Sequence, residues 1–245
     1  VGTWGHRVWT FVRTRPLGAL GGAILVVMVL IAVFADAIAT HNPVVQDIPN
    51  RLTPPGAKFY LGTDTFGRDV FSRIVHGARV SLFVGLVSAA LGTSIGTFIG
   101  IASAYVGGKV DLVVQRMVDA TMAFPTLVLA LIIVAAFGAS LTNVVIAVVI
   151  ALIPQAVRLS RSNALSIKQE TYVLAAQAMG ASFLRTMLRH ILPNSLAPVL
   201  VLATEYLAEA VLAEATLSVL GLGVPPPHPS WGRMLQEGAH LGDWG

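Results

Sequence analysis

The fold is decided by a long run without charged residues, at positions 120–157, which reads ATMAFPTLVLALIIVAAFGASLTNVVIAVVIALIPQAV. The stretches 16–35 and 80–108 also lack Asp, Glu, Lys and Arg. About 20 apolar residues are enough to cross the hydrocarbon core of a bilayer. In lipid, each backbone polar group needs an internal partner, which leaves only helices or a closed barrel. Because these runs are continuous rather than alternating, the sequence predicts an all-α, polytopic transmembrane protein.

The composition points to the same class. Hydrophobic residues make up 55% of the chain and charged residues 11%, whereas a soluble domain carries about 25% charged residues. The absence of cysteine excludes a disulfide framework and thiol chemistry. The net charge of +4 does not indicate a nucleic acid partner, because the basic residues lie in short loops, as membrane topology requires. The first apolar run lacks a small-residue cleavage site, so we expect an uncleaved anchor.

Five spans account for the apolar runs within a single transmembrane domain, 1–245. One helix over 120–157 would be about 57 Å long, which is too long for one crossing. Gly138 to Ser140 and Asn143 mark a turn within that run, and Pro125 and Pro154 predict helix kinks. The predicted spans are roughly 17–38, 80–106, 112–137, 142–159 and 195–223.

The distribution of Lys and Arg sets the orientation. With the N-terminus in the cytosol, ten of these residues lie inside and six outside. The loop 160–193 is then cytosolic, and the segments 39–78 and 224–245 are extracytoplasmic. Within 39–78, we expect either a short interfacial helix leading into the second span or a solvated connector. The chain opens on Val1 rather than Met, so we expect its true start to lie upstream.

Small residues recur every fourth position along the second span. A helix places them on one stripe, where two backbones approach closely in lipid. The contact is either a static packing surface or a sliding one, and both require a second helix there. The stripe consists of Ser88, Gly92, Gly96, Gly100, Ala104 and Gly108.

Three carboxylates lie in the predicted fifth span, where each costs about 2.5–3.5 kcal/mol at mid-bilayer. At 100° per residue, Glu205 and Glu209 lie about 40° apart, whereas Glu214 is about 180° from Glu205. We therefore expect Glu205 and Glu209 to approach a translocation pathway and Glu214 to bind neighbouring helices. The alternative is that all three are buried structural hydrogen-bonding groups.

The cytosolic loop has the pattern of a short docking helix. Glu170 and Thr171 give a helix start, and Gly180 gives a stop. Tyr172, Ala175, Ala176 and Met179 form an apolar ridge. Such a helix fits a groove on a partner protein, or lies on lipid headgroups. Farther along, we expect Pro193 to stop a second basic segment and Asn194 to cap the fifth span.

The sequence carries no motif for chemistry of its own. No P-loop is present, because Gly107-Gly-Lys109 is followed by Val110, and no Gly-x-Ser-x-Gly elbow is present. The six histidines are scattered without ligand spacing. If ATP drives this protein, another polypeptide binds it.

Several stretches of the sequence resemble one known protein family. Leu174-Ala-Ala176, Gly180 and Leu192-Pro193 resemble the coupling motif of bacterial ABC importer permeases, Glu-Ala-Ala, then Gly, then Ile-x-Leu-Pro. Leu174 and His190 depart from it, at the Glu and Ile positions. Further stretches resemble the second, C-type, permease subunit of the dipeptide/oligopeptide/nickel family. These stretches are 61–73, 77–79, Phe124-Pro125, 214–223 and 229–232.

The resemblance implies a type I ABC importer permease fold with six spans, the sixth lying after the chain end. It implies a bacterial cytoplasmic membrane protein that pairs with a homologous permease, two ATP-binding subunits and an extracytoplasmic binding protein. This chain would bind no cofactor, since ATP and Mg²⁺ sit on the partners. The residues of the implied coupling helix are Tyr172, Ala175, Ala176, Met179, Gly180 and Ala181.

The implied cargo is dipeptides or oligopeptides, moved by alternating access. Nickel, haem or another small solute remains an alternative within the same machinery. Two other classes also stay open: a secondary transporter that uses Glu205 and Glu209 for proton coupling, and a membrane scaffold that transports nothing.

Overall fold

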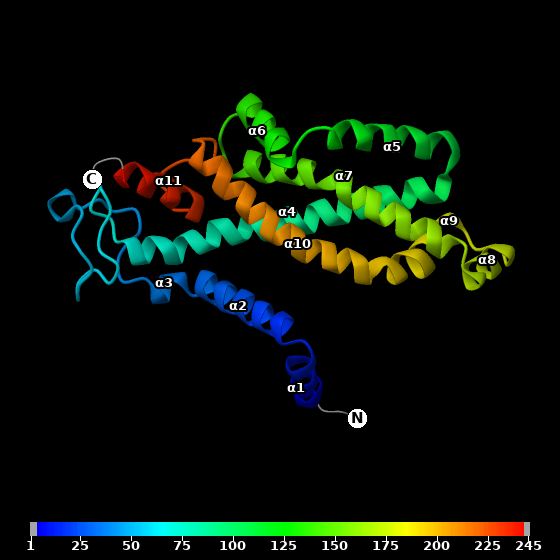
Figure 1. Ribbon diagram of the computed structural model, residues 1–245, viewed down its shortest axis with the longest axis horizontal. Helices are drawn as coiled ribbons and strands as arrows, with labels where there is room; N and C mark the ends of the chain where they lie inside the picture. The colour runs from blue at the N-terminus through cyan, green and yellow to red at the C-terminus, as the bar shows by residue number, and fades with distance from the viewer. Residues whose placement is uncertain (1–3, 243–245) are drawn as a thin grey trace. The chain divides into compact units, whose positions relative to one another are not determined.

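The computed structural model describes residues 4–242. Residues 1–3 and 243–245, and the sixth span expected after Gly245, lie outside the described residues. The described chain is helical without a β-strand, as Figure 1 shows by colour from the N-terminus to the C-terminus. It divides into two compact units, one of 1–82 with 227–231 and one of 83–226 with 232–245.

The first unit begins with α1 (Trp4–Thr14), α2 (Pro16–Val33) and α3 (Ala35–Ile38), followed by the single 3₁₀ turn η1 (Ile48–Asn50). It includes the first turns of α4 (Val70–Val106) and the first residue of α11 (Trp231–Gly242). The Trp231 indole donates to the carbonyl of Ile74 (3.0 Å). The small core of the first unit consists of Ala32, Ala78 and Leu82, with Met28, Val29, Ile31 and Trp231 packed against it.

The second unit is built from long helices. After the rest of α4 come α5 (Gly108–Met122), α6 (Thr126–Phe137), α7 (Leu141–Lys168), α8 (Thr171–Ala178), α9 (Phe183–Thr186), the π-helical turn η2 (Met187–Ile191) and α10 (Leu192–Val219). The buried Tyr206 of α10 donates its hydroxyl to the carbonyl of Leu152 in α7 (2.9 Å). The main core contains Val84, Val134, Val144, Val148, Leu152, Ala156, Tyr206 and Leu217.

Four of these helices are long and apolar enough to cross a membrane, and a bent pair makes a fifth candidate span. The four are α2, α4, α7 and the continuous helical stretch Phe183–Val219. The bent pair is α5 and α6, which meet at 87°. The predicted class, an all-α polytopic membrane protein, is confirmed.

Pro125 has a larger effect than the expected kink. The third span was expected to be one helix over 112–137, but the chain leaves helical geometry before Pro125, which has ψ of 137°. A proline disfavours helical geometry in the residue before it and cannot donate a backbone hydrogen bond. The structure therefore has two helices in place of one kinked helix.

Two helices are longer than predicted. α4 begins at Val70 rather than near residue 80, so the residues from Val70 onward that were expected to form a separate helix or a connector are its first turns. Asp69 caps its first turn by accepting a hydrogen bond from the Ser72 amide (3.0 Å). α7 begins at Leu141, where the Ser140 hydroxyl accepts from the Asn143 amide (3.1 Å), and continues to Lys168. Polar residues near the ends of α4 and α7 have hydrogen-bond partners, so a polar or charged residue in the sequence does not by itself mark the end of a helix.

The expected stop at Pro193 and cap at Asn194 are wrong. The helix runs from α9 through η2 into α10 without a break. A π-helical turn directly before Pro193 widens the backbone where a regular helix would clash with the ring. The Asn194 side chain donates to the carbonyl of His190 (2.6 Å), so it supplies a partner to the turn that contains Pro193.

The small-residue stripe of α4 packs on α7. A Cβ added at Gly92 would lie 3.1 Å from Leu152 Cβ. At Gly96 and Gly100, the added atom would overlap backbone atoms of α7. The hydroxyl of Ser160 on α7 donates to that of Thr97 on α4 (3.0 Å). The predicted close partner helix is therefore α7, whereas Gly108 leaves the stripe because it begins α5 with φ of +56°.

Candidate functional site

The predicted docking helix is α8, which follows α7 after a short turn. It begins after Glu170 and ends in a Schellman motif at Gly180, where φ is +83°. The Gly180 amide donates to the carbonyl of Gln177 (2.9 Å), and the Ala181 amide donates to that of Ala176 (3.0 Å). Only glycine adopts this backbone conformation without strain. The helix therefore has defined ends at both sides.

The exposed face of α8 differs from the predicted ridge. Tyr172, Ala175 and Met179 are exposed, and Met179 reaches 83%. Ala176 is buried at 7% together with Val173, which sequence reasoning did not single out. Leu174, at the consensus Glu position, is 51% exposed. The outer face therefore consists of Thr171, Tyr172, Leu174, Ala175, Ala178 and Met179.

Aromatic contacts tie α8 and the helices beside it together. The ring of Tyr172 lies 6.2 Å from that of His190 in η2. The Tyr105 ring of α4 packs edge-on against Phe183 of α9 (4.8 Å). Lys168 at the end of α7 donates to the Tyr105 carbonyl (2.9 Å) and lies over its ring. Beneath them is a buried cluster of Ile101, Ala104, Ala164, Met187 and Ile191.

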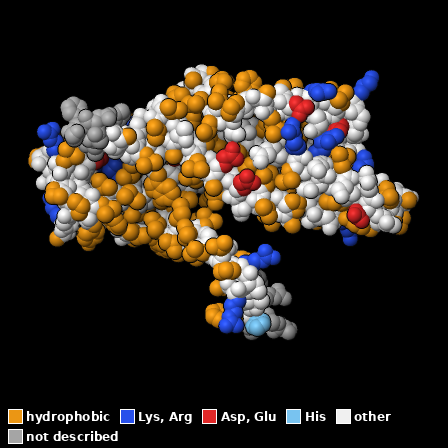
Figure 2. Space-filling view, viewed as in Figure 1, with side chains coloured by type: hydrophobic (Ala, Val, Ile, Leu, Met, Phe, Trp, Pro, Cys, Tyr) orange, Lys and Arg blue, Asp and Glu red, His pale blue; other side chains and the backbone are white. Residues whose placement is uncertain are grey.

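Ion pairs connect α5 to α7. Arg161 donates to both carboxylate oxygens of Asp111 (2.7 and 2.5 Å), and Ser103 of α4 donates to the same carboxylate (3.2 Å). Arg158 donates to Asp119 (2.6 Å). Figure 2 shows basic and acidic side chains gathered over α5 and the adjoining part of α7. A bidentate Arg–carboxylate pair fixes geometry as well as energy, so α7 and α5 are held in register.

The three glutamates of α10 have different surroundings. Glu205 is exposed, Glu209 is half-buried, and Glu214 is fully buried. Glu214 accepts a hydrogen bond from Ser218, one turn later on its own helix (2.9 Å). In Figure 2, acidic side chains lie midway along α10. The separation of Glu214 from the other two follows the predicted angles.

Glu205 lines an open hollow of about 670 Å³ between α7 and α10. Arg158, Gln155 and Ser162 line it from α7, and Pro198 lies inside α10 at the same hollow. Its walls carry both a cationic and an anionic side chain on a mostly apolar surface. Glu209 is not among the residues that line it.

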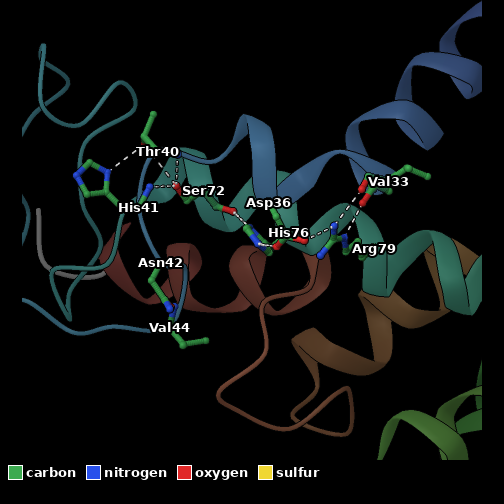
Figure 3. A network of polar contacts seen from close by, with 10 residues as sticks. Val33, Asp36, Thr40, His41, Asn42, Val44, Ser72, His76 and Arg79 are labelled. Carbon is green, nitrogen blue, oxygen red and sulfur yellow. Dashed lines mark hydrogen bonds and ion pairs between the residues drawn. The ribbon is translucent and has the colours of Figure 1, made fainter.

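A polar network in the first unit was not predicted from the sequence (Figure 3). His76 of α4 contacts the carboxylate of Asp36 (3.2 Å) and the Ser72 carbonyl (3.0 Å). Arg79 donates to Asp36 (2.9 Å) and to the carbonyl of Val33 at the end of α2 (3.0 Å). The contacts of His76 and Arg79 with Asp36 and Val33 join residues 40 to 46 positions apart, and no local pattern signals them.

Asp69 is the centre of the second part of this network. Its Oδ2 accepts hydrogen bonds from the Ser72 hydroxyl (2.5 Å), the Ser72 amide (3.0 Å) and the Thr40 hydroxyl (2.9 Å). Burial raises the pKa of Asp69, but these hydrogen bonds outweigh it and keep the pKa below its usual value. The carboxylate is therefore ionised at neutral pH. Among the residues described, no three His, Asp or Glu side chains are placed to hold a metal ion.

Two protein-family models match this chain. Residues 96–242 match the model of the binding-protein-dependent transport system inner membrane component. Residues 3–55 match that of the N-terminal TM domain of oligopeptide transport permease C. These two models together cover most of the chain.

Curated relatives agree with the models. A putative peptide transport system permease protein of Brucella suis is 47% identical over 219 residues, which is 89% of this chain and 74% of the relative. The probable D,D-dipeptide transport system permease protein DdpC of Escherichia coli is 40% identical over 97% of this chain and 80% of its own length. The glutathione transport system permease protein GsiD of Shigella dysenteriae is 37% identical over 95% and 77%.

The resemblance drawn from the coupling motif and the flanking stretches is thus confirmed, and with it a multi-pass inner membrane location. The chain belongs to the family of inner membrane components of binding-protein-dependent transport systems, as a permease of the oligopeptide permease C type.

Proposed function

We propose that this chain is a permease subunit of an ATP-driven ABC importer that carries dipeptides or oligopeptides across the bacterial cytoplasmic membrane. The cargo proposal is supported by the relatives, whose names specify peptides, D,D-dipeptides and glutathione, all of them peptide-like solutes. The N-terminus and α8 lie in the cytosol, as the ten-to-six distribution of basic residues favours.

The observation that carries the proposal is α8. It is a short helix with fixed ends and an exposed face that is mostly apolar, and it is packed on the ends of α7 and η2. Such a face fits a groove on a partner. The partner is an ATP-binding subunit, which holds ATP and Mg²⁺, and two of these act with a homologous permease and an extracytoplasmic binding protein. The contact residues on this chain are Tyr172, Leu174, Ala175 and Met179, with Gly180 and Ala181 ending the helix.

A chain of helix contacts connects α8 to the hollow that Glu205 lines. Through Tyr172 and His190, α8 contacts η2, which continues directly into α10. α8 also comes directly after α7, which ends at Lys168. α7 packs on α10 at Tyr206. The hollow is lined by α7, which α8 follows in the chain, and by α10, which continues the η2 turn that α8 contacts. A displacement of α8 by ATPase closure moves these packed helices as rigid elements and alternates access to the pathway.

The absence of cysteine in the chain makes the docking face directly testable. We expect Met179→Cys, at the most exposed position of α8, to crosslink to a single cysteine in the cognate ATPase subunit with a short bifunctional reagent. The yield should change when ATP is bound, because the contact moves with closure. The measurement is the crosslinked band in membranes that contain the assembled transporter.

Val45→Cys, exposed in the first unit, is the matched control for Met179→Cys. It should give no crosslink to the same ATPase cysteine. Equal crosslinking at both positions, or none at Met179→Cys in a complex that hydrolyses ATP, would contradict the assignment of α8 as the coupling helix.

Glu205 and Glu209 remain our candidates for the pathway. Glu205 shares its hollow with Arg158, and Arg158 already pairs with Asp119, so Glu205 is the charge that the surface offers to the ammonium end of a zwitterionic peptide. We expect Glu205→Gln to lower peptide uptake by about tenfold, the effect of losing one charged hydrogen bond of about 1.5 kcal/mol. Glu209→Gln should have a smaller effect, because Glu209 does not line the hollow. Uptake of a labelled dipeptide at matched protein level measures both.

Glu237→Gln, a conservative change on α11 away from the hollow, should leave uptake at the wild-type value. If Glu205→Gln also transports at the wild-type rate, an essential role of Glu205 in the pathway is excluded.

A further inference from the structure

The corner between α1 and α2 is a basic surface that none of the functions above uses. α2 begins at Pro16 directly after Arg15 and is one of the candidate spans. Its 18 residues make a helix about 27 Å long, which matches a hydrocarbon core of about 30 Å. The corner therefore lies at the level of the lipid headgroups, at one surface of the membrane, in either orientation of the chain.

Backbone hydrogen bonds and the Phe11 ring hold this corner in one geometry. The Arg15 amide donates to the Phe11 carbonyl (2.8 Å), and the Ala19 amide donates to the Arg15 carbonyl (3.0 Å). The Phe11 ring lies against α2 at Gly18, where an added Cβ would be 3.5 Å from the Phe11 Cζ atom. An open hollow of about 580 Å³ lies at the corner, and its lining includes Phe11, Arg15 and Leu17.

Two guanidinium groups at the corner have donors to spare. Arg13 and Arg15 are exposed, and neither forms an ion pair or a side-chain hydrogen bond with a described residue. Arg13 lies 5.4 Å from the centroid of the Trp9 ring, a contact that does not use up its five N–H donors. The neighbouring Thr10 and Thr14 donate their hydroxyls to carbonyls one turn earlier (2.8 Å each). The guanidinium groups are therefore available to an acceptor from outside the chain.

The charge around the corner selects an acceptor with net negative charge. The sequence before Asp36 has no acidic residue, and it contains Arg7, Arg13 and Arg15. Basic side chains are visible on α1 in Figure 2. Asp36 lies in α3, beyond the other end of α2, and its carboxylate already accepts a hydrogen bond from Arg79 (2.9 Å). A zwitterionic headgroup would therefore find donors for its phosphate here but no carboxylate for its ammonium group.

Apolar side chains lie directly beside the two arginines. Leu17 is 84% exposed, and the rings of Trp9 and Phe11 are also exposed. Tryptophan is typical of the depth where headgroups meet acyl chains. A small inorganic anion would leave this apolar surface uncovered. The complementary ligand therefore carries both an anionic headgroup and a hydrocarbon chain.

We propose that the corner of α1 and α2 binds an anionic phospholipid. Its phosphate accepts hydrogen bonds from Arg13 and Arg15, and its acyl chain contacts Phe11 and Leu17. The planar guanidinium group of arginine matches phosphate oxygens in a bidentate geometry. The bound lipid holds α1 at the membrane surface. The residues of this site are shared neither with α8 nor with the hollow that Glu205 lines.

Native mass spectrometry of the purified full chain in detergent tests the site. The anionic probe is dioleoyl phosphatidylglycerol, and the zwitterionic probe is dioleoyl phosphatidylcholine. We expect the first phosphatidylglycerol to bind at least about fivefold more tightly than the first phosphatidylcholine. The double variant Arg13→Gln with Arg15→Gln should lower the affinity for phosphatidylglycerol by about 30-fold, since each arginine near an anionic headgroup contributes about fivefold. The two lipids should then bind equally.

Arg51→Gln with Lys58→Gln is the matched control, because it removes two charges from exposed positions of the first unit outside the corner. It should keep the preference for phosphatidylglycerol. Arg13→Lys with Arg15→Lys should keep most of it, because the charge remains; a loss as complete as in the glutamine pair would place the effect in folding and overturn the lipid site. A preference that survives the glutamine pair, or one that the control pair also loses, would overturn it too.

Two other occupants are distinguished in the same assay. Glycerol phosphate carries the phosphate without acyl chains, so it should not displace phosphatidylglycerol at equal concentration. If it does, the corner is a site for a free phosphate and the lipid assignment is wrong. If the purified wild-type chain shows no preference for phosphatidylglycerol, the lipid assignment is also wrong, and the corner is left to an acidic protein surface.

Discussion

Ala175→Asp, which places one carboxylate on the exposed face of α8, is expected to lower peptide uptake by about 30-fold or more while the chain remains in the membrane. Ala175 is exposed, so its substitution should change the free energy of unfolding of this chain by at most about 0.5 kcal/mol. In the assembled importer, the same side chain would be buried against the ATPase. An unpaired charge at the centre of such a contact costs about 2 kcal/mol or more.

The measurement is uptake of a labelled dipeptide in cells, with the amount of chain in the membrane followed by immunoblot. Ala57→Asp is the matched control, because it makes the same exchange at an exposed alanine of the first unit. It should transport at the wild-type rate. Copurification of the ATPase subunit should fall with Ala175→Asp and not with Ala57→Asp. Wild-type uptake and copurification by Ala175→Asp would exclude this face as the coupling contact.

The structure shows that Ala175, and not Ala176, is the alanine whose substitution tests the contact with a partner. From the sequence, Ala175 and Ala176 were equivalent members of one ridge, because spacing alone does not say which side of a short helix packs on its own chain. Ala176 is buried beside Val173. A charge at Ala176 would disturb the packing of α8 on this chain, so lost uptake would not distinguish misfolding from a lost partner contact.

The helical, membrane-crossing class was predictable because lipid imposes a strong and simple constraint. A long uncharged run has to be helical, and its length fixes the number of crossings. The turn at Gly138 was also predictable, since glycine there has φ of +87°. These features depend on residues that are close in sequence, so a single sequence carries them.

Helix ends that depend on distant partners were not predictable. α4 begins at Val70 because Asp69 caps it, and Asp69 in turn is held by Thr40, which lies 29 residues away. Arg79 lies inside α4 because it bonds the end of α2. At Pro193, the sequence rule gave the wrong result, because a single π-helical turn accommodates the ring. In each case, a contact or a backbone adjustment outside the local pattern decided the outcome.

The close packing of the small-residue stripe of α4 on α7 predicts that added volume there destabilises the chain. Gly96→Ala is expected to lower the free energy of unfolding by about 1–3 kcal/mol. The added Cβ would overlap the Cβ of Ala156 and would lie 2.9 Å from the Ile153 carbonyl oxygen and 3.1 Å from the Val157 amide nitrogen. Backbone atoms of α7 cannot rotate away, so relief requires the two helices to separate.

Gly22→Ala is the matched control, because no atom lies within 4 Å of its added Cβ in the apolar helix α2. There, alanine should be neutral or stabilising, by up to about 1 kcal/mol, since glycine is the poorer helix former. Thermal unfolding of the purified chain in detergent measures both, and each kcal/mol shifts the midpoint by about 2–4 °C. Gly92→Ala, with its nearest contact at 3.1 Å to a side chain, should lie between them. If Gly96→Ala unfolds at or above the midpoint of Gly22→Ala, α4 and α7 are not in the close contact that the stripe and the structure indicate.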